Sequence, residues 1–195
     1  LLPLLIAQHH FNYAIAATLV FAMNLVSSII FYGLNTFLVL YWMHILKQSN
    51  TSGSLALSVL FIVGATGTII GGHLVDHIGA VKTIRFAFTI MPFLLLAFSL
   101  TKNVIVASAL LLPIGMLIFI PYSAIVLLGQ HYLPNQMGLA SGVTLGLAIS
   151  IGGIATPFLG QVADATSLIT VFFILTAVAL IPMGAAYFII EPTIK

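Results

Sequence analysis

Long apolar stretches separated by five short polar gaps constrain this sequence more than any other feature. The gaps fall at 47–53, 76–82, 101–103, 130–136 and 164–167. A helix needs about 20 apolar residues to cross the hydrocarbon core of a bilayer. The gaps therefore predict an all-α protein with six transmembrane helices, near 14–44, 54–75, 83–100, 104–129, 137–162 and 167–190.

Charged residues are nearly absent from the chain. They make up 4% of its 195 residues, whereas a soluble domain carries about 25%. The five basic and three acidic residues all lie in or beside a gap or a terminus, because a charge at mid-bilayer is costly. They form no basic face, so nucleic acid is not an expected partner. We expect a membrane protein in contact with lipid.

A short pattern recurs along the chain. Gly72 and Asp76 match Gly160 and Asp164 at an offset of 88 residues. Three helices fit in that length, so each copy has an odd number of spans and the copies are inverted across the membrane. Such inverted three-helix repeats are typical of secondary transporters. We expect repeats over 14–100 and 104–190; the alternative is a common small-residue helix ending.

The stretch from Gly72 to Lys82, Gly-His-Leu-Val-Asp-His-Ile-Gly-Ala-Val-Lys, resembles the Gly-x-x-x-Asp-x-x-Gly-basic signature of the major facilitator superfamily, in the copy between its eighth and ninth helices. The sequence departs from the signature at His77 and Ala80-Val81, where basic residues are usual. The run Leu-Pro-x-x-x-Gly-x-x-Ser-Gly over 133–142 and Ala-Asp-x-Thr-Ser over 163–167 resemble the fosmidomycin-resistance branch of drug exporters.

The resemblance implies that residues 14–195 are the carboxy-terminal six-helix half of a twelve-helix transporter, with 1–13 the end of a linker or of the preceding helix. It implies alternating access and proton-coupled efflux of small molecules or drugs across the plasma membrane. The partner is an amino-terminal six-helix half, upstream in the same chain or in a second copy. We expect no enzyme activity, no catalytic residue, no cofactor and no metal.

Polar residues on the first helix share one face. These residues lie at offsets that fit the helical period of 3.6 residues. They are Asn24, Ser27, Ser28, Tyr32 and Asn35. Such a face in lipid must meet other helices or water. We predict a substrate pathway formed by Asn24, Ser28, Tyr32, Asn35 and Tyr122, the last on a helix with two prolines. The alternative is interhelical hydrogen bonding.

The signature predicts a gating motif made of Gly72, Asp76, Gly79, Lys82 and Arg85. Asp76 is expected to approach the positive N-terminus of the fifth helix near Met137 and Gly138. Lys82 and Arg85 are expected to contact lipid phosphates or that carboxylate. The alternative is that these are ordinary charges flanking a span.

Glycines recur at small-residue spacing on the second and fifth helices. Close backbone approach is the usual role of such spacing, and we predict helix packing by Gly67, Gly71, Gly138, Gly142 and Gly146. The third and sixth helices are almost wholly apolar and are expected to face lipid.

Three other functions are conceivable for such a sequence. One is a non-transporting membrane module that associates through its Gly-rich helices, and another is a facilitator that imports a small polar solute. A metal enzyme is disfavoured, because a histidine-box site needs about eight histidines or added carboxylates, whereas the chain has six histidines in all. Lys82, Arg85 and Lys195 on one side, against Lys47 and Lys102 on the other, favour cytoplasmic termini.

Overall fold

The chain forms a bundle of long helices in the computed structural model, which describes residues 2–132, 138 and 142–189. Over these residues the predicted all-α fold with six helices is confirmed. The elements are α1 (Leu2–His44), α2 (Asn50–Ile78), α3 (Ala80–Leu100), α4 (Val104–Tyr132), the π-helical segment η1 (Gly142–Leu147), α6 (Ala148–Ala165) and α7 (Leu168–Ala186).

The helix ends follow local chemistry. Ser49 precedes α2 and its hydroxyl accepts a hydrogen bond from the backbone N–H of Ser52 at 3.2 Å, and Ser167 does the same for Thr170 before α7. These are N-caps, which satisfy backbone donors that a first helical turn leaves unpaired. The first helix begins at Leu2 instead of near residue 14. Residues 4–13 contain neither Pro nor Gly, so nothing in them stops a helix.

Five of the described helices are long and apolar enough to cross a membrane. They are Ile15–His44, Asn50–Ile78, Ala80–Leu100, Val104–Tyr132 and Leu168–Ala186. The chain is therefore a multi-pass membrane protein. The remaining helix, α6, continues from η1 without a break and contains three glycines, a proline and Asp164.

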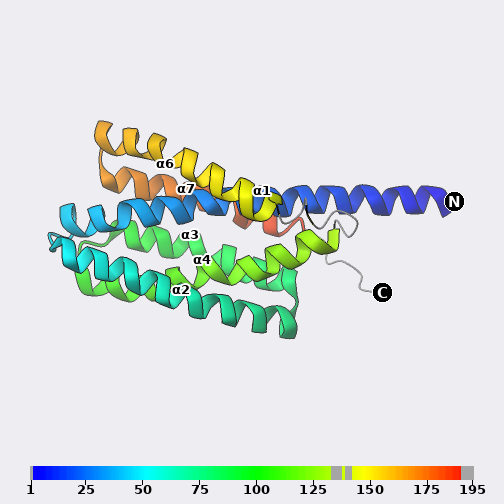
Figure 1. Cartoon of the computed structure of the whole chain (residues 1–195), viewed down its shortest axis with the longest axis horizontal. Coiled ribbons are helices and arrows are strands. Elements are labelled where there is room, and N and C mark those ends of the chain that lie inside the picture. Colours follow the sequence, from blue (N-terminus) through cyan, green and yellow to red (C-terminus); the bar gives the residue numbers. More distant parts are fainter. Residues whose placement is uncertain (1, 133–137, 139–141, 190–195) are drawn as a thin grey trace.

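Successive helices alternate in direction. Figure 1 shows the α1–α2, α3–α4 and α6–α7 connections at one end of the bundle and the α2–α3 turn at the other. The first helices of the two repeats, α1 and α4, therefore run in opposite directions. The packing is related in the same way, since α1 packs on α6 and α7 while α4 packs on α2 and α3. This is the arrangement of two inverted three-helix repeats.

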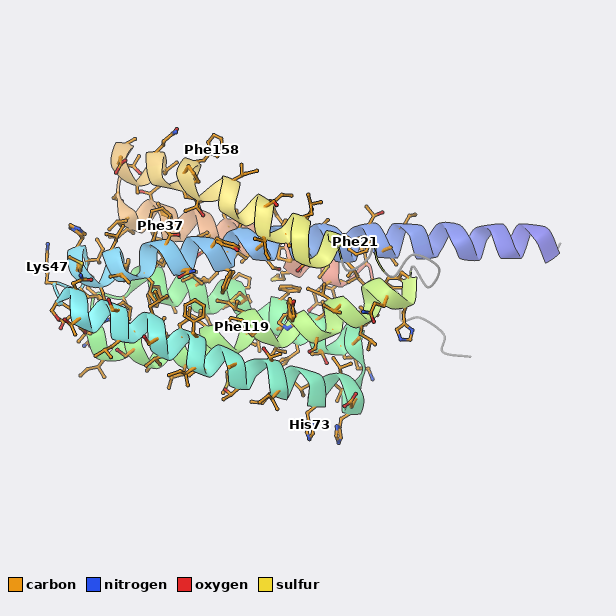
Figure 2. All side chains as sticks on the ribbon, in the orientation of Figure 1. Phe21, Phe37, Lys47, His73, Phe119 and Phe158 are labelled. Atoms are coloured by element: carbon orange, nitrogen blue, oxygen red, sulfur yellow. The ribbon has the colours of Figure 1, made fainter. Side chains whose placement is uncertain are left out.

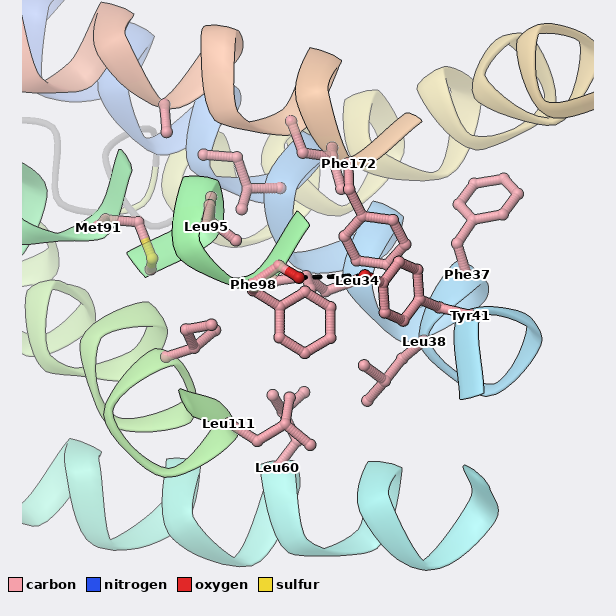
Figure 3. Close-up of a cluster of buried hydrophobic side chains, with 14 of the residues drawn as sticks. Leu34, Phe37, Leu38, Tyr41, Leu60, Met91, Leu95, Phe98, Leu111 and Phe172 are labelled. Carbon is pink, nitrogen blue, oxygen red and sulfur yellow. Dashed lines mark hydrogen bonds between the residues drawn. The ribbon is translucent and has the colours of Figure 1, made fainter. Parts of the chain in front are cut away.

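An aromatic cluster fills the core near the end of α1 (Figure 3). The rings of Tyr41 and Phe172 lie 4.6 Å apart between centroids, and those of Tyr41 and Phe98 lie 5.0 Å apart. The buried Tyr41 hydroxyl lies 2.8 Å from the Thr101 carbonyl oxygen and 3.1 Å from that of Phe98. It donates to carbonyls at the C-terminal end of α3, where the Phe98 carbonyl also accepts from the Thr101 N–H at 3.3 Å.

The third helix is not simply a lipid-facing helix. Of the five candidate spans, α3 is the most buried, because it packs between α4 and α7. Only one side of it remains outward, where Phe86, Phe93, Leu96 and Leu100 are exposed. The expectation that this helix mainly faces lipid was wrong.

Candidate functional site

A cavity of about 250 Å³ lies between α1, α4 and α6. Its lining comes from the interior of α1 and α4 and from the start of α6, and consists of Asn24, Ser27, Ser28, Phe31, Tyr32, Ile118, Phe119, Tyr122, Ala148 and Ile149. Four of the five residues predicted for the substrate pathway meet here. The fifth, Asn35, lies farther along α1, half-buried and outside the lining.

The polar groups of the cavity are neutral. Asn24 is 7% exposed and supplies an amide. The hydroxyl of Ser27 donates to the Met23 carbonyl, and that of Ser28 to the Leu25 carbonyl, both at 2.7 Å. Because these protons are held by the helix itself, the serines present mainly acceptor oxygens. The cavity is suited to an uncharged ligand portion with apolar or aromatic surface.

Phe31 is the centre of an aromatic wall along the cavity. Its ring centroid lies 5.3 Å from Tyr32, 5.6 Å from Phe119 and 6.0 Å from Phe61. All three pairs are edge-to-face, the arrangement that aromatic quadrupoles favour. The wall therefore joins α1, α2 and α4, and Figure 2 shows Phe119 in the interior of the bundle.

Sequence reasoning missed all five apolar residues of the cavity lining. Phe31, Ile118, Phe119, Ala148 and Ile149 carry no signal that separates a cavity wall from a lipid-facing or core position. The recurrence of Phe31 and Phe119 at the 88-residue offset was available in the sequence.

The predicted gating motif divides between two separate structural roles. Gly79 ends α2 and begins α3 with φ 91° and ψ 156°, a conformation essentially limited to glycine. Asp76 and Lys82 are exposed, and neither side chain forms an ion pair or hydrogen bond with another described residue. A methyl group at Gly72 would meet nothing within 4 Å. The predicted contact of Asp76 near Met137 lies outside the described residues.

Arg85 binds the end of α7, although the carboxylate of Asp76 or lipid phosphate was expected. Its guanidinium donates to the carbonyl oxygens of Ala186 at 3.1 Å and Ile189 at 3.0 Å. It also lies 5.8 Å from the centroid of the Tyr187 ring. A cation is favourable at a helix C-terminus, where unpaired carbonyls concentrate negative partial charge.

The glycines predicted for packing occupy two different environments. Gly67 and Gly71 lie against α4, and a methyl group there would come 2.8 Å from the Met116 oxygen and 2.5 Å from the Ile120 oxygen. At Gly138, Gly142 and Gly146 it would meet no described atom within 4 Å. The first two lie at a close helix contact within the bundle. The other three lie on a surface that no described residue covers.

The charged side chains of the described residues lie near the two ends of the bundle. Figure 2 labels Lys47 at one end and His73, three residues before Asp76, at the other. The described carboxylates, Asp76 and Asp164, lie near the ends of α2 and α6 and take no part in the cavity lining. Among the described residues, no group of three or more potential metal-ligating His, Cys, Asp or Glu side chains comes together.

These features define a class: a multi-pass all-α membrane protein with inverted three-helix repeats and a cavity between helices of both repeats. Two curated proteins are similar to the chain in sequence. The fosmidomycin resistance protein of Escherichia coli (strain K12) is 30% identical to it over 151 residues, which are 77% of this chain and 37% of that protein.

A second relative is the uncharacterized MFS-type transporter YfnC of Bacillus subtilis (strain 168). It is 32% identical over 115 residues, 56% of this chain and 27% of that protein. The matched part is thus only 37% and 27% of the two curated relatives. No protein-family model matches the chain. The resemblance to major facilitator transporters, and to the fosmidomycin-resistance type in particular, is confirmed by these two similarities.

Proposed function

We propose that the chain is the carboxy-terminal six-helix half of a major facilitator transporter and that it works by alternating access. The cavity between α1, α4 and α6 is the observation that carries this proposal. It combines helices from both inverted repeats, and the binding sites of secondary transporters lie at such repeat interfaces near the bilayer midplane. The similarity to an MFS-type transporter supports the same function.

An amino-terminal six-helix half completes the transporter, either in the same chain or as a second copy. The uncovered surface at Gly142 and Gly146 is suited to meet that half, because small residues let helices slide past one another closely. In this arrangement both termini of the segment lie on the cytoplasmic side of the plasma membrane, where Lys82 and Arg85 follow the positive-inside rule.

The proposed activity is proton-coupled efflux of small molecules or drugs, by analogy with the relative named for fosmidomycin resistance. The uncharged lining of this half fits an apolar or aromatic part of the cargo. No described carboxylate lines the cavity, so the proton carrier belongs to the amino-terminal half, or one of the histidines serves.

Uptake into inside-out membrane vesicles tests this function in the full-length protein. Under an imposed proton gradient, we expect accumulation of fosmidomycin or of the neutral dye N-phenylnaphthylamine, abolished by a protonophore. Asn24→Leu should slow uptake about fivefold, the equivalent of losing one hydrogen bond of about 1 kcal/mol. Thr36→Leu, at an exposed position on the same helix, is the matched control and should transport normally.

The competing interpretation is a non-transporting module that associates through the exposed glycines. It predicts vesicles with no protein-dependent flux of either compound, with or without a gradient. Flux that follows the concentration gradient and ignores the protonophore would instead indicate a facilitator. Either result would contradict the proposed coupled efflux.

A further inference from the structure

We propose that Gly64 and Gly152 are a repeat-related pair of specificity-determining positions. Each provides space for one aromatic ring of the cavity wall, and together they set the size of the ligand portion that the cavity admits. Neither glycine lines the cavity itself. The role in choosing cargo rests on the proposed transport function, whereas the control of cavity size can be tested without it.

The first position lies on α2. Gly64 is buried, and a methyl group added there would overlap the ring of Phe119. The nearest atoms are all ring atoms of that side chain, with no backbone among them. Phe119 lines the cavity on another side. A side chain at position 64 would therefore displace the ring, and the cavity is the free space beside it.

The second position lies on α6. Gly152 is buried, and a methyl group added there would overlap the ring of Tyr32 and come 2.9 Å from the Ser28 carbonyl oxygen. Both Tyr32 and Ser28 line the cavity. Position 152 thus controls a second ring of the same aromatic wall, and it also fixes how closely α6 approaches α1.

The two positions are equivalent by the internal repeat. They are separated by the same 88 residues that relate Asp76 to Asp164. The hydroxyl of Thr68 donates to the Gly64 carbonyl at 3.3 Å, and that of Thr156, at the same offset, donates to the Gly152 carbonyl at 3.0 Å. The two glycines therefore have the same local hydrogen bonding, and we assign them the same role of providing space for a ring.

Each glycine accommodates a ring that belongs to the other repeat. Gly64 of the first repeat accommodates a ring on α4 of the second, and Gly152 of the second accommodates a ring on α1 of the first. Phe31 and Phe119, also 88 residues apart, touch each other edge-to-face at 5.6 Å. Aromatic rings from both repeats thus border the cavity, and we infer that their positions depend on the two glycines.

Neighbouring glycines provide matched controls. Gly67 lies one turn from Gly64 on the same helix contact, but a methyl group there would meet backbone atoms of Met116 and no cavity ring. Gly153 is adjacent to Gly152 and exposed, and a methyl group there would meet nothing within 4 Å. These positions separate damage to helix packing from displacement of a ring.

Thiol labelling of a cavity cysteine tests the proposal. The 195 residues contain no cysteine, so Ser27→Cys adds one defined thiol to the cavity lining of the full-length protein, with any cysteine elsewhere replaced by serine. The small reagent is methyl methanethiosulfonate and the large one is pyrene maleimide. Gly64→Ala and Gly152→Ala should each slow the large reagent about tenfold, the equivalent of about 1.4 kcal/mol, with much less effect on the small one.

Removing the displaced ring should reverse the effect. Phe119→Ala in the Gly64→Ala background should restore the labelling rate of pyrene maleimide, and Phe119→Ala alone should raise it even if Gly64→Ala fails to fold. Gly153→Ala should match the parent. Gly67→Ala should not discriminate between the reagents.

Equal slowing of both reagents by Gly64→Ala and Gly67→Ala would overturn the proposal, as would a large-reagent rate that Phe119→Ala leaves unchanged. If labelling is size-selective but the protein transports neither compound, the proposed transport function is wrong, whereas the proposal that the two glycines control the size of the cavity is supported.

Discussion

Gly79 illustrates how a single residue of the gating motif has a structural role that its position in the signature does not reveal. It is the point where α2 ends and α3 begins, and its φ of 91° is positive. Its N–H donates to the Val75 carbonyl and its own carbonyl accepts from the Thr83 N–H and hydroxyl. One glycine thereby closes one helix and starts the next in a tight turn.

Gly79→Ala should lower the free energy of unfolding by about 1–3 kcal/mol, the cost of holding a Cβ-bearing residue in such a conformation. Denaturation in detergent micelles measures it. Gly72→Ala is the control, because a methyl group there meets no neighbour. The higher helix propensity of alanine should raise the free energy of unfolding of this variant by up to about 1 kcal/mol. Equal stability of the two variants would show that the turn imposes no such strain.

Among the residues of the cavity, the sequence allowed the polar ones to be predicted, but none of the apolar ones. Asn24, Ser28 and Tyr32 stand out because polar side chains on one helical face need a partner or water in a membrane. Phe119 and Ile149 are indistinguishable in type from side chains that face lipid. The partners of Arg85 were also unpredictable, since they are backbone carbonyls about a hundred residues away in the chain.

Among the elements, α3 and α7 are joined at one end of the bundle by the Arg85 side chain. Besides its hydrogen bonds to the Ala186 and Ile189 carbonyls, this side chain lies beside Tyr187, whose hydroxyl is 2.9 Å from that of Thr89 on α3. The end of α7 is therefore held by two contacts from the same helix.

Arg85→Leu should destabilise the protein by about 1.5–3 kcal/mol, the range for hydrogen bonds from a charged group. Hydrogen exchange should accelerate selectively in the amides around Ala186 and Tyr187. Lys82→Leu, at an exposed cation without a partner in the described part of the chain, should change stability by less than about 0.5 kcal/mol. Uniform acceleration throughout α7 would argue against a local role at its end.

Helix number was predictable because charge and polar gaps mark the ends of apolar spans. The π-helical segment η1 was not, since its sequence Gly-Val-Thr-Leu-Gly-Leu has the same composition as the α-helical stretches around it. The burial of α3 was equally hidden, because Phe and Leu side chains occupy both its buried face and its exposed face. Which of its faces packs is decided by its neighbours α4 and α7.

For the whole molecule, the inversion of the two repeats could be predicted from the number of helices between the two matching motifs. An odd number of helices between matching motifs reverses the second copy, and the observed helix directions agree. The position of the cavity could not be obtained in this way. It depends on how α1 and α6 approach at Gly152 and how α2 and α4 approach at Gly64, and spacing along one helix does not determine contacts between helices.

The central claim is that the cavity between α1, α4 and α6 opens in turn to both sides of the membrane. Labelling of a Ser28→Cys variant of the full-length protein by a membrane-impermeant thiol reagent tests it most directly. The reagent is added first to one side of sealed vesicles and then, in a separate sample, to the other. Ser54→Cys, near the start of α2 and exposed, is the sidedness control and should react from one side only.

Alternating access predicts that the cysteine at position 28 reacts from both sides, and that a transported compound slows the reaction from each. Reaction from a single side, or from neither, in vesicles where the control reacts normally would contradict the account.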